Sequence, residues 1–208
     1  MFRRYPQPFV FYFFMALVLA GCSYSGPGPR LPVVTEVPIA VDGATVSPVT
    51  FGGVVIAIEP ETLLGFHYEG AGMAKDFDYR WGPNFTEKTE EMNLDVLDIL
   101  GDAGYRTIPW PDGGVKETPT GEPVLELHAT VTLMEFNSFS TAGGYYQAYT
   151  VVLWELTHPG DGTSLFKAET EGYQKENEHN AGVLRKAFDQ ALTNLLADQG
   201  FAAAVAGK

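Results

Sequence analysis

The stretch from Val124 to Lys175 constrains the fold most, because it contains three strand patterns separated by two turn signals. Apolar and polar residues alternate from Leu125 to Leu133, which is typical of a strand with one buried face. Gly143-Gly144 and the run from Pro159 to Gly162 supply the turns. Strands joined by such turns predict an antiparallel sheet, and the charges along the third pattern predict an edge strand.

Two helical patterns flank these strands. One runs from about Phe85 to Ala103, with Gly104 as its end, and the other follows Asn180 and stops at Gly200. An apolar strand is predicted over Gly53–Ile58, and its apolar residues on both faces predict a central position. The expected fold is therefore α+β: a two-layer sandwich in which two helices pack on one face of a mostly antiparallel sheet.

Composition excludes several classes of protein. The 208 residues are 45% hydrophobic, which is too apolar for a disordered tail. The net charge of −13 argues against a nucleic-acid partner, because phosphates require a basic face. The single cysteine excludes an intrachain disulfide framework and a multi-cysteine metal site. No cofactor is expected.

The N-terminus carries an export signal. Arg3 and Arg4 precede an apolar run of 12 residues from Phe9 to Ala20, which is too short to span a bilayer and suits a signal peptide. The run leads into Leu19-Ala20-Gly21-Cys22, which resembles the bacterial lipobox, whose cysteine is lipidated and becomes the new N-terminus. The alternative is an ordinary secretory signal with an incidental cysteine.

Residues 1–21 are therefore predicted to be a lipoprotein signal peptide, and residues 22–50 a lipidated Cys22 with a flexible Pro/Gly-rich tether. Val33–Val37 or Ile39–Val41 could instead add an edge strand. Residues 51–208 are predicted to form one periplasm-facing domain. By resemblance to proteobacterial lipoproteins, Ser23 after the cysteine implies the outer membrane rather than the inner membrane.

Cleavage removes Arg3 and Arg4, so 11 basic and 26 acidic side chains remain, a net charge of −15. Anionic headgroups should repel such a surface. The lipid on Cys22 is therefore the predicted link to the membrane.

The order of elements resembles that of the YajG-type bacterial lipoproteins. The resemblance rests on the lipobox ending at Cys22, the strand Val54–Ile58, the helix closing with Gly104-Tyr105, the strand opened by Pro123, and the final amphipathic helix. It covers most of the chain by element order. It implies a fold and an outer-membrane address, but no reaction.

Motifs for chemistry are sparse. The sequence lacks the serine-hydrolase elbow, the zinc-protease helix motif and the phosphate-binding loop. Glu176, Glu178 and His179 form the best metal candidate, although a solvated approach to the last helix explains them more simply. Asp76 and Asp78, near Glu69 in sequence, could act as a carboxylate pair, but exposed hairpin charges are the simpler interpretation. No enzyme is predicted.

Aromatic residues are concentrated between Phe66 and Phe85, where a glycine-rich centre predicts a hairpin. Large rings gather at binding surfaces and also fill cores. The residues proposed for contact with a partner are Phe77, Tyr79, Trp81, Tyr145 and Tyr146.

The leading functional hypothesis is a lipid-anchored, non-catalytic accessory or scaffold subunit of an envelope complex. The alternative is an amphiphile-binding or transport-associated lipoprotein, which would require a cavity between the helices and the sheet.

Overall fold

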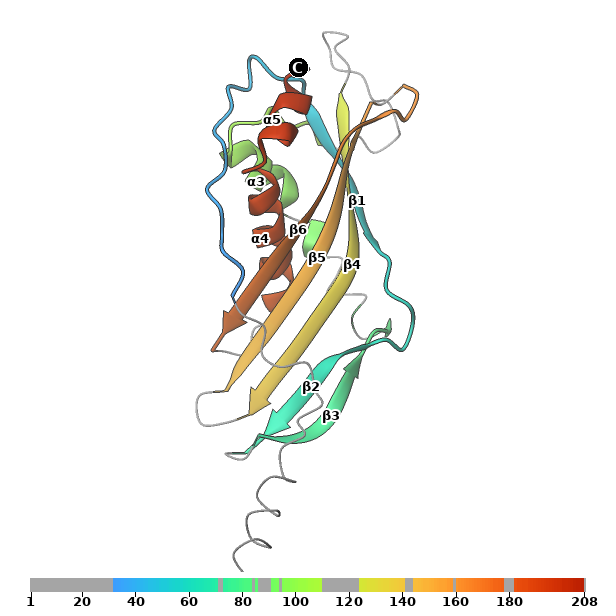
Figure 1. The fold of residues 1–208 in the computed structure, drawn as a ribbon, viewed down its shortest axis with the longest axis vertical. Helices are drawn as coiled ribbons and strands as arrows, with labels where there is room; N and C mark the ends of the chain where they lie inside the picture. The colour runs from blue at the N-terminus through green and yellow to red at the C-terminus, as the bar shows by residue number, and fades with distance from the viewer. Residues whose placement is uncertain are drawn as a thin grey trace, which may run out of the picture. The chain divides into compact units, whose positions relative to one another are not determined.

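The computed structural model describes residues 32–70, 73–83, 85, 91–93, 95–109, 124–140, 144–158, 160–177 and 182–207. They form an α+β domain with a mixed six-stranded sheet (Figure 1). The elements are β1 (Val49–Ile56), β2 (Leu63–Glu69), β3 (Ala74–Arg80), the 3-10 helix η1 (Glu91–Asn93), α3 (Val96–Asp102), β4 (Leu125–Ser140), β5 (Tyr145–Thr157), β6 (Ser164–Glu176), α4 (Val183–Leu195) and α5 (Gln199–Val205).

The sheet is mixed: three of its strand pairings are antiparallel and two are parallel. Its order is β3-β2-β4-β5-β6, and β1 also pairs with β4. The three predicted strands β4, β5 and β6 form an antiparallel meander with β6 at the edge, as expected. At 16 residues, β4 has room for two parallel partners: β1 beside Leu125–Val131 and β2 beside Ser138–Ser140.

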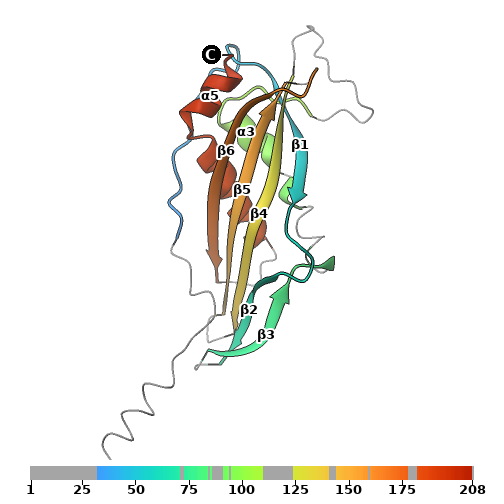
Figure 2. The same ribbon diagram turned by 45° about the vertical axis from the view of Figure 1, so that its right-hand side comes forward.

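The side chains of β5 divide between the two faces of the sheet. Val152, Trp154 and Leu156 are fully buried, and the ring of Trp154 packs 5.3 Å from that of Phe188 on α4. The intervening Leu153 lies on the opposite face and is partly exposed. In Figure 2 the helices lie behind the strands, which leaves this second face toward the viewer.

The seam between β6 and α4 is unusually close. A Cβ on Gly172 would overlap the backbone carbonyl of Ala187, so only glycine allows this approach. Beside it, Trp154 Nε1 donates to Thr170 Oγ1 at 2.8 Å, and that hydroxyl donates to the carbonyl of Ala191 at 2.7 Å. The seam is therefore closed by packing and by the satisfied side chains of Trp154 and Thr170.

The described part of the first predicted helix is not one continuous α-helix. It consists of η1 followed by α3, which begins at Val96, while residues 84, 86–90 and 94 lie outside the described residues. Gly104 follows α3 with φ of +92°, which is the left-handed conformation predicted for it.

The prediction that the last helix stops at Gly200 is wrong. The carboxylate of Asp198 accepts hydrogen bonds from the backbone N–H groups of Gly200 and Phe201, and this cap starts α5. The predicted last helix is therefore two α-helices, α4 and α5. Asn180, the predicted cap of α4, lies outside the described residues.

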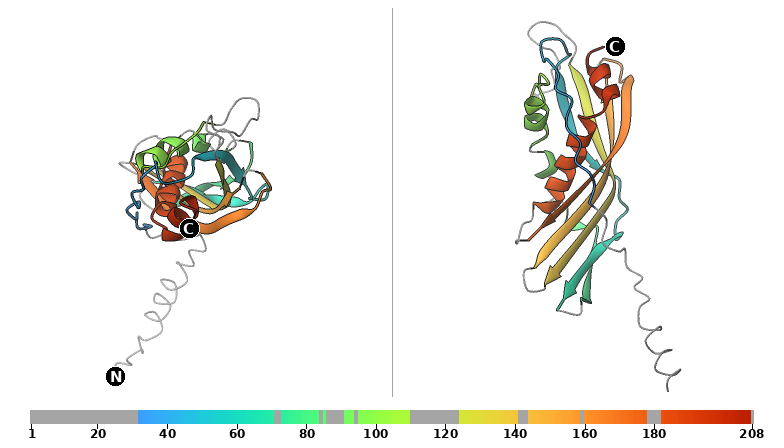
Figure 3. Two further views of the ribbon diagram at one scale, coloured as in Figure 1. Left: turned by 90° about the horizontal axis from the view of Figure 1, so that it is seen from above. Right: turned by 60° about the vertical axis from the view of Figure 1, so that its left-hand side comes forward.

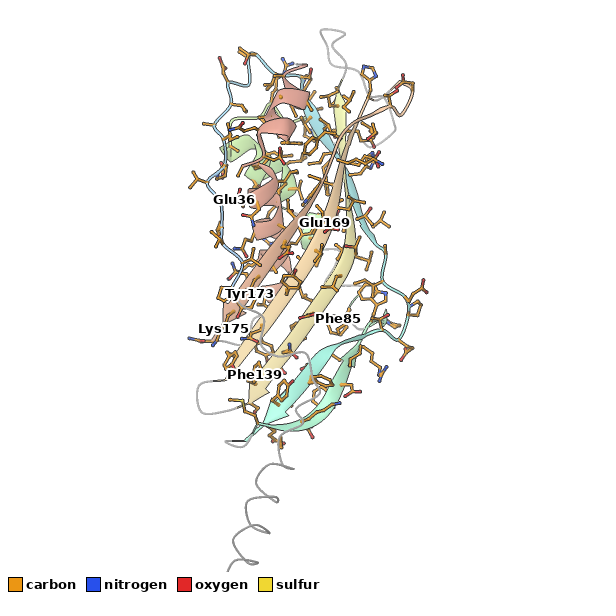
Figure 4. The ribbon with its side chains drawn as sticks, viewed as in Figure 1. Glu36, Phe85, Phe139, Glu169, Tyr173 and Lys175 are labelled. Atoms are coloured by element: carbon orange, nitrogen blue, oxygen red, sulfur yellow. The ribbon has the colours of Figure 1, made fainter. Side chains whose placement is uncertain are left out.

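The described part of the predicted tether is bound to the helices. We call residues 33–48 the N-terminal strap. Gln190 Nε2 donates to the carbonyl of Val33 at 3.0 Å, Ile39 N–H donates to the carbonyl of Leu196, and Ser47 N–H to that of Val205. The strap runs beside the helices in Figure 3, and Glu36 marks it in Figure 4.

The domain therefore begins before residue 51, in contrast to the predicted boundary. Val46 is buried, and β1 starts at Val49 rather than at Gly53. Among the named strands β1 pairs only with β4, so it is not central. Neither Val33–Val37 nor Ile39–Val41 forms a strand. Side chains of α4 hold the strap in place of sheet pairing.

Candidate functional site

The predicted aromatic hairpin exists as β2 and β3. The two strands are antiparallel, and the end of β2 pairs in parallel with the end of β4. A Cβ on Gly65 would overlap the carbonyl of Phe136, so glycine permits β2 to lie this close to β4. Asn137 Oδ1 accepts a hydrogen bond from Phe66 N–H at 3.0 Å. The hairpin is thus attached to the long central strand.

Phe77, Tyr79 and Trp81 alternate along β3 and its continuation, which places them on one face. Phe77 stacks on His67 with ring centroids 4.8 Å apart, and it meets Tyr79 edge-on at 5.1 Å. Phe77 remains 47% exposed. Trp81 extends the pairing, because its N–H donates to the carbonyl of Thr62 at 2.9 Å. The three residues form a partly exposed row of rings.

Tyr79 joins this row to the interior of the domain. Its ring lies 4.8 Å from that of Phe136, and its hydroxyl lies 2.8 Å from Ser138 Oγ. Ser138 Oγ in turn lies 2.6 Å from His67 Nδ1. Burial raises the pKa of Tyr79, while the hydrogen bond with Ser138 opposes that shift. The phenol is therefore neutral at physiological pH and serves as a hydrogen-bonding anchor.

The contact between His67 and Ser138 was not predicted, because 71 residues separate them and neither belongs to a recognisable motif. A serine beside an imidazole can form a nucleophile–base pair. Here Ser138 is only 2% exposed and its oxygen also contacts Tyr79, so a substrate could not reach it in this conformation. The geometry fixes the orientation of the rings.

A pocket of about 430 Å³ opens beside this row, within the size range of small-ligand sites. The lining combines four aromatic rings with three charged side chains: Phe77, Tyr79, Trp81, Phe85, Glu61, Asp78 and Arg80. An apolar wall with a charged rim suits an anchor residue of a protein partner or an amphipathic small molecule.

The charged rim is held by Arg80. Its guanidinium donates to Asp78 Oδ2 at 3.2 Å and to the carbonyl of Glu61 at 3.0 Å. The ammonium of Lys75, 2.7 Å from Asp78 Oδ1, is the main cause that lowers the pKa of this carboxyl, and Arg80 adds to it. Glu61 adopts φ of +62°, a conformation that non-glycine residues rarely adopt. Lys75, Asp78 and Arg80 therefore form a connected group of exposed charges along the rim.

Tyr145 and Tyr146 do not join this pocket. As neighbours on β5 they point to opposite faces. Tyr145 stacks on Phe139 at 4.3 Å and carries the ammonium of Lys175 over its ring at 3.9 Å. Tyr146 packs on the core side, 6.0 Å from Phe136. The five predicted contact residues thus divide into a pocket row of three and two separate tyrosines.

The structure adds little support for the other sites that the sequence suggested. No group of three or more potential metal ligands occurs among the described residues. Glu176 forms an ion pair with Lys186, while Glu178 and His179 lie outside the described part of the chain. Cys22 also lies outside it. Within that part, no helix is long and apolar enough to cross a membrane.

No protein-family model matches the chain, and no curated protein matches it. Among solved structures, a Xanthomonas campestris protein of the family DUF330 is similar, with 13% identity and a TM-score of 0.41 over 85% of this chain and 96% of that one. Lipoprotein GNA1162 from Neisseria meningitidis has 13% identity and a TM-score of 0.35 over 73% and 98%. PelC from Paraburkholderia phytofirmans, a dodecamer, has 13% identity and a TM-score of 0.35 over 78% and 90%. These distant likenesses do not show the YajG-type family or a function.

Proposed function

We propose that this chain is a lipid-anchored lipoprotein of the bacterial cell envelope and serves as a non-catalytic accessory or scaffold subunit of an envelope complex. The observation that carries the proposal is Leu19-Ala20-Gly21-Cys22 in register with the preceding apolar run. Ser23 supports the outer membrane as the address, with the domain facing the periplasm. The net acidic charge of the mature chain supports attachment through lipid rather than through protein surface.

The aromatic pocket supports a role in contact with a partner. Tryptophan, tyrosine and arginine are the residue types most enriched at the energetic centres of protein interfaces. Trp81, Tyr79 and Arg80 line one pocket, and the last two have fixed hydrogen bonds. Rings that are already ordered lose little entropy when a partner binds. Phe77, Tyr79 and Trp81 are therefore the proposed contact row.

The anchor is tested with Cys22→Ala. This variant should lose incorporation of labelled palmitate and should leave the membrane fraction, because the acceptor thiol is gone. Ser23→Asp is the matched variant: it should keep the label but shift the protein toward the inner membrane. Labelled lipid on Cys22→Ala would refute the anchor.

The contact row is tested with Trp81→Ala. We expect crosslinking to envelope proteins in intact cells to fall by roughly tenfold or more, with only a modest change in melting temperature, because interface anchors act on binding rather than on folding. Val37→Ala, which truncates an exposed apolar residue of the strap, is the control. A large drop in melting temperature with unchanged crosslinks would instead assign Trp81 to the core.

The pocket also favours one alternative, an amphiphile-binding lipoprotein. The interface between α4 and the sheet is filled by fully buried side chains such as Trp154, Phe188 and Leu192, so an amphiphile would have to occupy the hairpin pocket. Titration with a fluorescent fatty acid distinguishes the two roles. Saturable binding that Trp81→Ala abolishes would favour the alternative.

A further inference from the structure

The face of the sheet opposite α4 carries exposed apolar side chains at its centre. Val55 on β1 is 62% exposed, Leu133 on β4 is 37% exposed, and Leu153 on β5 is 36% exposed. On the other face, apolar residues of β4 and β5 such as Val131, Val152 and Trp154 are fully buried. Single exposed apolar residues need no explanation, but a contiguous group on a monomer usually marks an interaction site.

Strand register places these residues in two adjacent rows of the sheet. Thr130 pairs with both Val55 and Leu153, so these three lie in one row across β1, β4 and β5. In the next row Leu133 pairs with Val151. Side chains of paired residues lie about 5 Å apart on the same face of a sheet. We call Val55, Leu133, Val151 and Leu153 the apolar strip.

The border of the strip along β6 is acidic. Glu169 pairs with Leu153, and Glu171 pairs with Val151, so each row of the strip ends in a carboxylate. Both side chains are exposed, and neither has an ion-pair partner among the described residues. By contrast, Glu155 in the adjacent row is bound to Lys167 at 3.0 Å. Figure 4 labels Glu169 on β6.

We propose that the apolar strip docks a basic amphipathic segment of a partner protein. The apolar side of that segment would cover Val55, Leu133 and Leu153, and its Lys or Arg side chains would pair with Glu169 and Glu171. Charge complementarity selects this occupant. A second copy of the chain would bring a further charge of −15 in its mature form, and anionic lipid would be repelled. The proposal rests on the scaffold role and places a second contact surface away from the hairpin pocket.

The test uses two synthetic 18-residue helical peptides with the same leucine spacing, one with lysine and the other with glutamate at every polar position. Binding to the lipidated full chain in non-ionic detergent micelles is followed by fluorescence anisotropy, with empty micelles subtracted. The lysine peptide should bind at least about tenfold more tightly than the glutamate peptide. Leu133→Ser with Leu153→Ser should weaken its binding by roughly tenfold. These side chains are exposed, so the melting temperature should change little.

Two controls distinguish binding at the apolar strip from non-specific attraction of the lysine peptide to an acidic protein. Glu169→Lys with Glu171→Lys should reverse the preference between the peptides, whereas Asp98→Lys with Asp102→Lys on α3 changes the net charge equally and should not. Val37→Ser should bind like the unaltered chain. Three outcomes would overturn the proposal: no effect of the strip variants, an equal effect of the α3 variants, or sedimentation showing that the strip holds two copies together. None of them bears on lipidation of Cys22, so failure here leaves the anchor intact.

Discussion

The layer between α4 and the sheet and the β2–β3 hairpin use aromatic residues in opposite ways. In the layer, Trp154 and Phe188 are fully enclosed, and the indole N–H is satisfied by Thr170. In the hairpin, Phe77 is nearly half exposed, and the hydroxyl of Tyr79 is hydrogen-bonded to the hydroxyl of Ser138. Sequence composition alone does not separate the two, because both regions are rich in rings. Enclosure by partners distant in sequence decides whether a ring stabilises the fold or remains available for binding.

The largest expected effect tests the enclosed region. Leu192→Asp places a charge at a fully buried position on α4, and it should cost about 5 kcal/mol or more in free energy of unfolding. Leu192→Ala, at about 2–5 kcal/mol, keeps the test measurable if the aspartate variant does not fold. Phe77→Asp, the matched hairpin variant, should cost about 1 kcal/mol. Chemical denaturation measures all three. Equal losses in free energy of unfolding at Leu192 and Phe77 would contradict the proposed difference between the two regions.

A smaller effect is expected at the seam of the layer. Gly172→Ala would push α4 away from β6, because its Cβ overlaps the carbonyl of Ala187, and it should cost about 2–3 kcal/mol. Gly101→Ala is the control: this glycine lies in α3, where an added Cβ would make only an ordinary contact with Thr107 Oγ1 at 4.0 Å, and alanine should add about 0.5–1 kcal/mol of stability. The two variants are compared by thermal melting. An unchanged melting temperature for Gly172→Ala would mean that α4 can move away from β6 without a loss of stability.

The smallest effect concerns Asp189, on the side of α4 near the strap. Burial raises the pKa of Asp189 to about 6, and Asp95 raises it further, while Arg185 and Lys186 oppose the shift. The folded state therefore keeps this proton up to about pH 6, whereas the unfolded chain releases it near pH 4. Stability should accordingly fall as the pH rises from about 4 to 6.

Asp189→Asn removes that dependence. After allowance for solvent screening, the variant should be about 1 kcal/mol more stable than the unaltered chain at pH 7. The difference should disappear below about pH 3, where the aspartate is protonated in both states. Melting curves from about pH 3 to pH 7 provide the measurement. A gain that persists at about pH 3 would point to a cause other than ionisation.

Local patterns predicted the elements whose partners are close in sequence. The alternation after Leu125 and the turns that follow it predicted β4, β5 and β6, and Gly70-Ala71-Gly72 predicted the hairpin. The parallel pairing of β1 with β4 was not predicted. It joins Val49 to Leu125 across 76 positions, and no turn signal encodes such a connection.

The sequence prediction placed Phe77, Tyr79 and Trp81 in one aromatic-rich hairpin, and in the structure these three residues line one pocket. Their contact with a partner stays a prediction. The alternation of side chains along a strand should have separated Tyr145 from Tyr146, which occupy opposite faces of β5. The contacts of Ser138 with His67 and Tyr79 depend on the pairing of β2 with β4, which local sequence does not encode.

The strap also determines how tension on the N-terminus would enter the domain. Gln190, which is buried, donates to Val33 and Thr35 while accepting from the N–H of Tyr173 on β6. Asn194 joins the carbonyls of Val34 and Glu171. A pull along the chain from Cys22 would therefore load α4 and β6 first. The ten residues between Cys22 and Val33 can extend about 35 Å at most. A lipid on Cys22 would therefore keep the domain within about that distance of the membrane surface.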